Sequence, residues 1–471
     1  MMNKIEYKGV WWLPEKPEEQ IPGTLKFTPD EGAILELAGS FKDISFKDIE
    51  NMDKMLKSEI ILGVSADGEK ITLYKCFESD FEITVRPSFQ KFPTSVFRAE
   101  FVFIGAHFQK PEDIKFKSIS VHYSHLDEWV NISGFTFQYK SDTGEFLIKY
   151  KLPEPIQAKI NKDCKISIDF KVTYPTRSIV QKEANIKQRT YIRIEHSIEK
   201  SLDEYLNIMR HIQNFLSLGV TEPVYPSKIT GITEANKHTI TDNPYISPVE
   251  IYYRLPEISR APRTVYPHNM LFTFKDISDR FEMFLKNWFE KANTLEPVYD
   301  LYFGPLYNPR MYLRHQFLSL IQALEAYHRR NFEGKYLPDD DYGRVRKKLE
   351  EFIDGLRIDS SFKNALKNKL KYGNEYSLRK RLKEIFRQYK EITDNFITNK
   401  DVFINKVVEI RNYLTHYDKN SREIAVDKKQ LYHITQQLKI VIVICLLSEL
   451  GFNFKEIKNL LARNYKYIFN R

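Results

Sequence analysis

The spacing of hydrophobic and polar positions changes character at about residue 271 of this chain. In the first 198 residues or so, apolar side chains gather in short or alternating runs separated by turn residues, which is typical of β-strands. These runs are Thr24–Phe27, Ala33–Leu37, Ile71–Tyr74, Glu100–Ile104, Phe135–Tyr139 and Lys165–Phe170. Asp67-Gly68 marks a hairpin turn. Many short strands in succession predict an antiparallel sandwich or barrel.

A helix and a connector follow this β-rich part. Leu202, Leu206, Met209, Ile212 and Leu216 form one helical stripe, and Gly219 is expected to close the helix. Residues 220–270 are rich in Pro, Thr and Tyr. They predict an irregular connector with one strand at Ile251–Tyr253.

From about residue 271 the period is helical to the end. Three core stripes stand out: Leu313, Phe317, Leu320, Ile321 and Leu324; Phe403, Val407, Ile410 and Leu414; and a fully apolar helix over 429–449, with Gly451 as its cap. The predicted fold class is therefore α+β and multidomain, with a β-rich domain followed by an all-α bundle. We place an N-terminal domain at 1–270, with a β-rich core at 1–198 and a helix and connector at 199–270, and a helical domain at 271–471.

Composition narrows the class of protein. The 471 residues are 42% hydrophobic and 29% charged, as in an ordinary soluble globular protein. The three cysteines, Cys76, Cys164 and Cys445, lie far apart, which argues against disulfides or a zinc site and favours a reducing cytosol. The first residues lack the apolar core of a secretory signal, and the apolar run Ile440–Leu447 is too short to span a bilayer. We expect a cytoplasmic protein without a membrane segment, metal or cofactor.

Charge points to a possible class of partner. The net charge is +9, and residues 361–390 hold ten Lys or Arg against only Glu375 and Glu384. Such a segment suits a nucleic acid, because phosphate neutralisation drives that binding. A solvated helical face is the alternative reading.

The candidate chemistry lies in Arg411-Asn412-Tyr413-Leu414-Thr415-His416. A permanent cation and an imidazole that titrates near neutral pH suit phosphodiester chemistry on RNA. An arginine five residues before a histidine also occurs at Arg263 and His268, and at Arg310 and His315. The pair Arg263 and His268 follows Pro262 and is expected in a loop. The pair Arg310 and His315 spans the expected start of a helix after Pro309.

Helical geometry separates the third match from the other two. Asn412 and His416 point almost opposite to the apolar stripe, and Arg411 lies about 70° from the centre of that stripe. All three side chains are thus expected on a polar, approachable arc. The competing interpretation is an ordinary polar helix end, with His416 near the negative end of the helix dipole.

These motifs resemble the HEPN superfamily, whose signature is an arginine, four to six residues and a histidine, often with a polar residue after the arginine. Asn412 fills that polar position, and Phe317–Arg330 resembles the first HEPN helix of one subgroup. The segments Gly9–Pro14, Ile21–Leu25 and Leu35–Gly39 are similar to the N-terminal domain paired with it. Together they resemble ApeA-type anti-phage HEPN proteins over most of the chain.

The resemblance implies a metal-independent endoribonuclease that acts through the RNA 2′-hydroxyl. His416 would be the general base or acid, Arg411 would stabilise charge on the phosphorane, and Asn412 would orient a phosphate oxygen or the imidazole. Glu325, His328 and Tyr413 are supporting candidates. RNA-backbone candidates in the basic segment are Lys367, Lys369, Lys371, Arg379, Lys380, Arg381, Lys383 and Arg387.

Partners also follow from the resemblance. A HEPN site is usually completed by a second chain, so a homodimer or higher even oligomer is implied. The substrate class is host RNA, with transfer RNA expected, and the N-terminal domain would sense an infection signal such as a phage protein. The alternative is a catalytically silent HEPN dimer that acts as an RNA- or protein-binding scaffold. A weaker third reading makes carbohydrate or peptide binding the main role of the N-terminal domain.

Several residues have a competing structural reading. Glu325 and Arg329 are spaced for an intrahelical ion pair, with His328 on the core side. His122 and His125 invite a metal reading, but on a strand they would face opposite sides. Trp11-Trp12 is expected in the core or at the rim of the sandwich.

Overall fold

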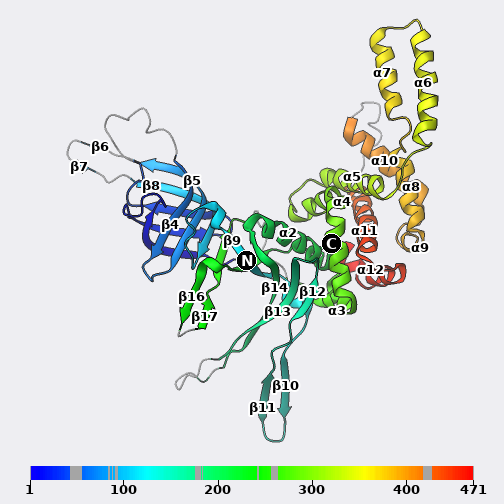
Figure 1. Ribbon diagram of the computed structural model, residues 1–471. Coiled ribbons are helices and arrows are strands. Elements are labelled where there is room, and N and C mark those ends of the chain that lie inside the picture. Colours follow the sequence, from blue (N-terminus) through cyan, green and yellow to red (C-terminus); the bar gives the residue numbers. More distant parts are fainter. Residues whose placement is uncertain are drawn as a thin grey trace. The chain divides into compact units, whose positions relative to one another are not determined.

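The computed structural model describes residues 2–42, 56–82, 85–86, 89–90, 94–175, 182, 184–240, 243–255, 264–416 and 427–469 (Figure 1). The chain divides into two compact units, Met1–Lys286 and Asn287–Arg471. An antiparallel β-rich unit comes first and a helical unit second, so the predicted α+β, multidomain class is confirmed.

Six strands of the first unit close into an antiparallel barrel. They are β1 (Ile5–Trp12), β2 (Ile21–Thr28), β3 (Gly32–Leu37), β4 (Lys57–Ser65), β5 (Lys70–Glu82) and β8 (Thr94–Ile104). Their order is β8-β3-β2-β1-β4-β5, and β5 pairs again with β8 to complete the ring. Turn residues Asp67-Gly68 join β4 to β5, as predicted, with Gly68 at φ +85°.

Trp11 shows how the alternating pattern fills this barrel. Its side chain is completely buried, whereas Trp12 is only partly so. Gly63 on β4 lies against the Trp11 ring, and a Cβ at residue 63 would come within 2.2 Å of Trp11 Cε3. The expectation that Trp11-Trp12 belongs to the core is confirmed for Trp11.

Strand β8 joins the barrel to a second run of antiparallel strands. Its first half pairs with β3, and Phe101–Ile104 pair with β18 (Val249–Tyr253). The sheet continues through β15 (Pro226–Ile232), β9 (Lys115–Tyr123), β14 (Lys187–Ser201), β13 (Cys164–Thr173) and β12 (Ile156–Lys159). The connector expected at 220–270 therefore contributes two strands to the sheet, and the prediction of a single strand there was wrong.

Short pairs of strands complete the described part of this unit. They are β10 (Phe135–Lys140) with β11 (Glu145–Tyr150), β16 (Lys237–Ile240) with β17 (Asn243–Ile246), and β6 (Val85–Arg86) with β7 (Phe89–Gln90). The β10–β11 hairpin extends away from the sheet (Figure 1). Its exposed aromatic side chains include Phe137, Tyr139 and Phe146.

Helix α2 (Leu202–Val220) covers the apolar face of the second run of strands. It begins with a capping box in which the Ser201 and Glu204 side chains bond each other's backbone N–H groups. The Tyr205 hydroxyl donates to the Phe116 carbonyl oxygen at 3.1 Å, which fixes the helix on β9. A short helix, α1 (Leu126–Val130), packs beside it.

Gly219 does not close α2, and that prediction was wrong. The helix continues to Val220, and Thr221 takes the left-handed capping position with φ +64°. A Cβ on Gly219 would lie 2.7 Å from Trp129 Nε1 and 3.0 Å from the Phe272 carbonyl oxygen. The glycine is needed for this close approach rather than for the turn.

In the described residues of the second unit, the secondary structure is helical apart from an isolated bridge between Lys335 and Glu375. After α3 (Phe274–Ile277), its helices are α4 (Phe281–Tyr307), α5 (Leu313–Asn331), α6 (Asp339–Gly355), α7 (Ser360–Lys371), α8 (Leu378–Gln388), α9 (Lys390–Thr393), α10 (Lys400–His416), α11 (Lys428–Leu450) and α12 (Phe454–Phe469). Of the predicted stripes, Phe317 on α5 and Val407 on α10 are fully buried.

Helix α11 is the core helix of this unit. It packs against α5 and α12, and all eight residues of Ile440–Leu447 are buried. It is long and apolar enough to cross a membrane by length and composition, but two thirds of its most apolar window (67%) is covered by the protein. Gly451 closes it with φ +106°, so the predicted buried helix and its cap are both confirmed.

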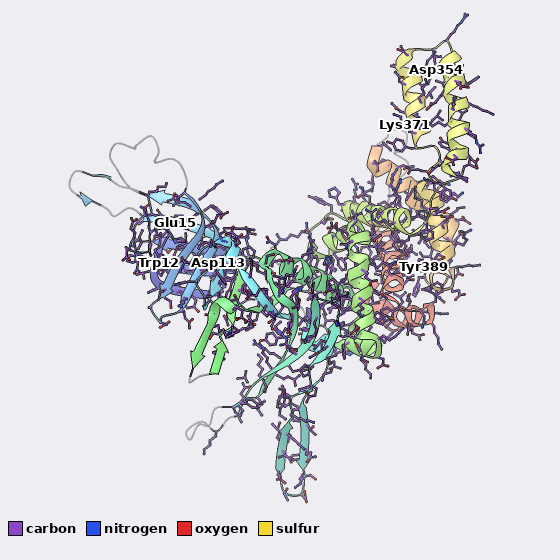
Figure 2. The ribbon with its side chains drawn as sticks, in the orientation of Figure 1. Trp12, Glu15, Asp113, Asp354, Lys371 and Tyr389 are labelled. Carbon is purple, nitrogen blue, oxygen red and sulfur yellow. The ribbon has the colours of Figure 1, made fainter. Side chains whose placement is uncertain are left out.

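Helices α6 and α7 form a pair that extends from the other helices of the unit (Figure 1). Lys367 bonds Asp354 at 2.6 Å, and Figure 2 places Asp354 near the outer end of this pair. Apolar side chains such as Phe352 and Phe362 remain exposed on it.

Candidate active site

Helix α10 is the frame of the candidate site. The Asn399 side chain accepts a hydrogen bond from the Val402 N–H at 3.1 Å, which starts the helix. Phe403, Val407, Ile410 and Leu414 are buried, as their spacing predicts. Because α10 packs on α5 and α8, this stripe fixes the direction in which its other face points.

The polar arc of α10 lies on the exposed side of the helix. Asn412, Thr415 and His416 are exposed, and Arg411 is half-buried. Arg411 Nη1 donates to Asn412 Oδ1 at 3.0 Å, and the Thr415 hydroxyl donates to the Arg411 carbonyl oxygen at 2.7 Å. The predicted placement of Arg411, Asn412 and His416 away from the core is confirmed.

Contacts with the described residues use only a small part of the hydrogen-bonding capacity of these side chains. Arg411 has four further N–H groups after its bond to Asn412. His416 makes no hydrogen bond or ion pair with any residue that the structure describes. It ends the described part of α10, and Asp418, Lys419 and Asn420 lie outside the described residues. The arc can therefore present a cation and a proton-transfer group to a phosphodiester.

Two of the supporting candidates, Glu325 and His328, make structural contacts, as their competing interpretation predicted. Arg329 Nη2 bonds Glu325 Oε1 at 3.1 Å along α5, which confirms the intrahelical pair. His328 is completely buried, with Nε2 2.8 Å from Glu384 Oε2, so its ring is not open to a substrate. Tyr413 is half-buried on α10.

The basic segment divides into paired and unpaired cations. Lys367 pairs with Asp354, Lys383 pairs with Asp401 at 2.8 Å, and Arg387 Nη2 lies 3.7 Å from Glu384. The Lys380 ammonium lies 3.9 Å from the centre of the Tyr376 ring. Lys369, Lys371 and Arg379 have no ion pair within the described chain and remain the most available to a phosphate backbone.

Arg381 departs from the expectation that it contacts RNA. Only 2% of it is exposed. Its Nε donates to the Tyr376 carbonyl oxygen at 2.9 Å, and its Nη2 lies 3.4 Å from Glu375. Its charge is used inside the helical unit, where the partners come from α5 and the loop before α8. Sequence reasoning missed this cluster because its members are up to 56 residues apart.

The other candidate motifs do not form sites. His122 lies on β9, but the strand ends at Tyr123, and His125 takes a left-handed turn with φ +62°. The expectation that both histidines share a strand was wrong. Among the described residues, no group of three or more His, Cys, Asp or Glu side chains could hold a metal ion. Arg310 and His315 straddle the start of α5, as predicted, while Arg263 lies outside the described residues.

The helical unit, which carries the Arg-x4-His motif on α10, contains a HEPN domain. The family described as Apea-like HEPN matches residues 318–456, from α5 into α12, and this stretch contains the motif. The family described as ApeA N-terminal domain 1 matches residues 6–288, more than half of the chain. The chain belongs to the ApeA family.

HEPN domains are generally ribonucleases, and the ApeA-like architecture supports an anti-phage function of the HEPN type. Searches among curated proteins and among solved structures found no match to this chain.

Proposed function

We propose that this protein is an anti-phage endoribonuclease that cuts host RNA without a metal ion, with transfer RNA as its substrate class. The observation that carries the proposal is the exposed arc on α10, where Arg411, Asn412 and His416 face away from a buried apolar stripe. The HEPN family match over the same helix supports it.

The reaction uses the 2′-hydroxyl of RNA as its nucleophile. His416 takes the 2′-hydroxyl proton as the oxygen attacks the adjacent phosphorus. The bond from phosphorus to the 5′-oxygen then breaks, and this oxygen takes a proton from a second imidazole. The products are a 2′,3′-cyclic phosphate and a 5′-hydroxyl. Because the nucleophile belongs to the substrate, the step needs no metal-bound water.

Arg411 stabilises the charge that builds on the phosphorane, since its guanidinium is always protonated and matches phosphate oxygens. Its bond to Asn412 holds the guanidinium toward the face of α10 that carries His416, and Asn412 acts as a positioning residue. A second imidazole from another copy of the chain completes the proton transfers, so the active form is a homodimer or a higher even oligomer.

Lys369, Lys371 and Arg379 are proposed to hold the RNA backbone, because these cations of α7 and the start of α8 lack partners within the described chain. The N-terminal unit is proposed to receive the infection signal, with a phage protein as the trigger.

The test compares RNA ends in cells that express the wild-type chain, Arg411→Ala or His416→Ala under phage infection. We expect new 5′-hydroxyl ends with the wild type and a loss of at least about 100-fold with either variant, the scale of a lost proton-transfer group. His315→Ala is the matched control, because His315 is exposed on α5 in a second Arg-x4-His match. Equal cleavage by His416→Ala and wild type would remove this motif from the reaction and favour a silent scaffold.

Cleavage by the purified, activated protein in the presence of EDTA checks the metal-independent chemistry. Persistence of activity is expected. Loss of activity that is restored by one divalent cation would contradict it.

A further inference from the structure

The second run of strands in the first unit has one strongly polar face. Cross-strand partners point to the same face of a sheet, and the register pairs Lys171 with Arg189 and Lys228 with His122. The face also carries Arg193, Asp169, Glu250 and Tyr252, because side chains two residues apart on a strand point to the same face. The opposite face is apolar and buried, with Val121, Ile192 and Ile229 among its residues.

Cations outnumber their partners on this polar face. Arg193 Nε lies 3.0 Å from Asp169, and Lys228 Nζ lies 2.6 Å from Glu250, so both carboxylates are already engaged. Lys171 and Arg189 have neither a hydrogen bond nor an ion pair with any residue in the described ranges. Within the described ranges these two adjacent cations therefore have no ion-pair partner, and the Lys171 ammonium lies 4.7 Å from the centre of the Tyr191 ring.

The pKa of Lys171 is consistent with this excess. Desolvation of its ammonium lowers the pKa, and the charges of Lys228 and Arg193 lower it further, against the opposing effect of Asp169. An anion placed on this face would relieve that repulsion.

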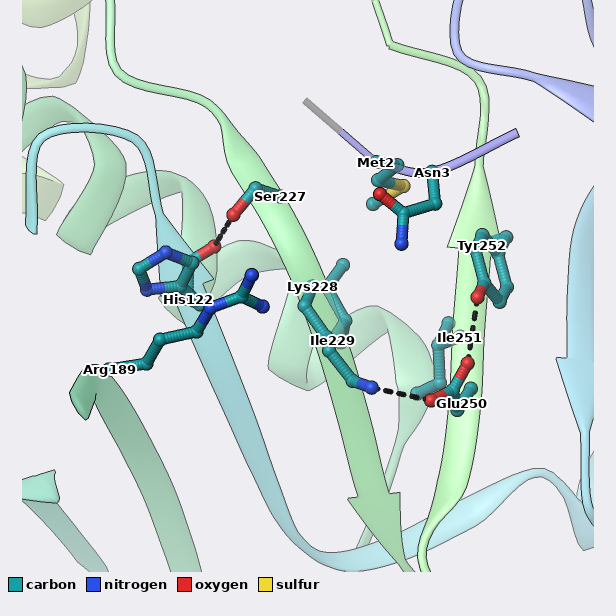
Figure 3. Close-up of a pocket in the computed structure, with 10 residues that line it drawn as sticks. All are labelled: Met2, Asn3, His122, Arg189, Ser227, Lys228, Ile229, Glu250, Ile251 and Tyr252. Atoms are coloured by element: carbon teal, nitrogen blue, oxygen red, sulfur yellow. Dashed lines mark hydrogen bonds and ion pairs between the residues drawn. The ribbon is translucent and has the colours of Figure 1, made fainter. Parts of the chain in front are cut away.

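A pocket opens on the same face, across four neighbouring strands. Its volume is about 350 Å³, at the lower end of the range of small-molecule sites. Figure 3 shows Arg189 and His122 on one side and Glu250 and Tyr252 on the other, with Lys228 between them. Met2 and Asn3 of the N-terminal segment add a further wall, and Met2 is only 4% exposed.

The two sides of the pocket differ in chemistry. Arg189 presents a fork of N–H donors that has no partner in the part of the chain that the structure describes. The carbonyl oxygen of the next residue, Thr190, accepts a bond from His122 Nδ1 at 2.7 Å, which fixes the imidazole beside it. On the other side Glu250 accepts from Lys228 and from the Tyr252 hydroxyl at 2.7 Å. A carboxylate can accept about four hydrogen bonds, so Glu250 keeps capacity for donors on a ligand.

We propose that this pocket binds a small phosphorylated sugar or nucleotide, with the phosphate on Arg189 and sugar hydroxyls on Glu250. An arginine fork matches phosphate oxygens in geometry and charge, and the remaining volume accommodates a ligand of mononucleotide size. The site lies wholly within the first unit, whereas the α10 arc belongs to the second.

The test is calorimetric titration of the purified full-length chain with adenosine monophosphate, ribose 5-phosphate, inorganic phosphate and adenosine. We expect both phosphorylated sugars to bind and adenosine to bind at least tenfold more weakly. Arg189→Ala should weaken binding of the monophosphate at least tenfold, while Arg189→Lys retains part of it. Arg210→Ala is the matched control, because it removes an exposed arginine from α2, outside the pocket.

Three results would overturn the proposal. These are the absence of binding heat for both phosphorylated sugars at millimolar concentration, equal affinity of Arg189→Ala and wild type, and equal affinity for adenosine and its monophosphate. Equal affinity for inorganic phosphate and for ribose 5-phosphate would overturn the assignment of the sugar to Glu250. A thermal unfolding curve of Arg189→Ala that matches the wild type shows that its loss of binding comes from the site and not from the fold, and partial binding by Arg189→Lys, which keeps the charge, supports the same conclusion.

Discussion

Arg381 Nη1 lies 3.0 Å from Nδ1 of His328, and both side chains are almost completely buried in the helical unit. An arginine can only donate, so Nδ1 accepts, and the hydrogen of this imidazole is on Nε2, facing Glu384 at 2.8 Å. The ring is therefore neutral, and it stacks on Phe332 with their centres 4.6 Å apart. The contact ties α5 to α8.

Loss of Arg381 should destabilise the protein strongly. Arg381→Met removes a buried cation and leaves the Glu375 carboxylate and the His328 Nδ1 acceptor without this donor. Removing one partner of a buried network lowers the free energy of unfolding by about 3–5 kcal/mol. Arg379→Met, an exposed change two residues earlier on α8, should stay within about 0.5 kcal/mol. Denaturant unfolding of the two variants beside the wild type measures the difference. Equal stabilities would contradict the buried role.

Stability should fall as the pH is lowered from 7.5 to 5.5, in part through His328. Desolvation by burial, together with the charges of Arg381 and Arg329, holds the pKa of His328 below its ordinary value, although Glu384 opposes this. Below pH 6.5 the His328 imidazole binds a proton in the unfolded chain but not in the folded chain, so the free energy of unfolding falls. His328→Gln should show a smaller fall in Tm over this range. A steeper fall in the variant would contradict the neutral ring.

Two helical glycines should respond to alanine with opposite signs. Gly219→Ala adds a Cβ against Trp129 and the Phe272 carbonyl, which should cost about 1–3 kcal/mol. Gly343→Ala on α6, an exposed position followed by Arg344, adds a Cβ with no atom within 4 Å beyond its chain neighbours and its own helix, and should stabilise the protein by up to about 1 kcal/mol, because alanine favours the helix. Thermal unfolding of both variants measures the two changes, and a destabilised Gly343→Ala would show that helix propensity does not govern that position.

A site built from two chains should make His416→Ala dominant. With a ninefold excess of the variant over the wild-type chain, most wild-type chains are paired with a defective partner, so cleavage per wild-type chain should fall several-fold. His315→Ala in the same excess should leave it unchanged. Cleavage that simply follows the amount of wild-type chain would indicate that one copy suffices.

The repetitive features of this fold were predictable from sequence. Alternation located strands such as β2 and β13, and the spacing of Phe403, Val407, Ile410 and Leu414 correctly placed His416 on the exposed side of α10 and Arg411 on its flank. Both depend only on the period of the backbone, which a local stretch of sequence contains.

What the sequence did not reveal depends on contacts between distant segments. Arg381 looked like one more cation of a basic segment, yet it is buried and bonds His328 and Glu375. Gly219 looked like a helix cap, because nothing nearby in sequence indicates that Trp129 packs on it. Likewise, the pairing of Lys171 with Arg189 follows from strand register, which no local pattern specifies.

The closure of β5 onto β8 has a consequence for self-association. Because of this closure, β1, β2, β3, β4 and β5 are each hydrogen-bonded to a strand on both sides, and β8 also pairs with the rest of the sheet. Among the described strands of the large sheet, the one with an unpaired edge is therefore β12. Only four residues long, β12 has its Lys159 N–H bonded to the Glu282 carboxylate at 3.0 Å. Short, capped edges are poor templates for adding another strand. A fibril or dimer that grows by β-augmentation is thus disfavoured at this edge.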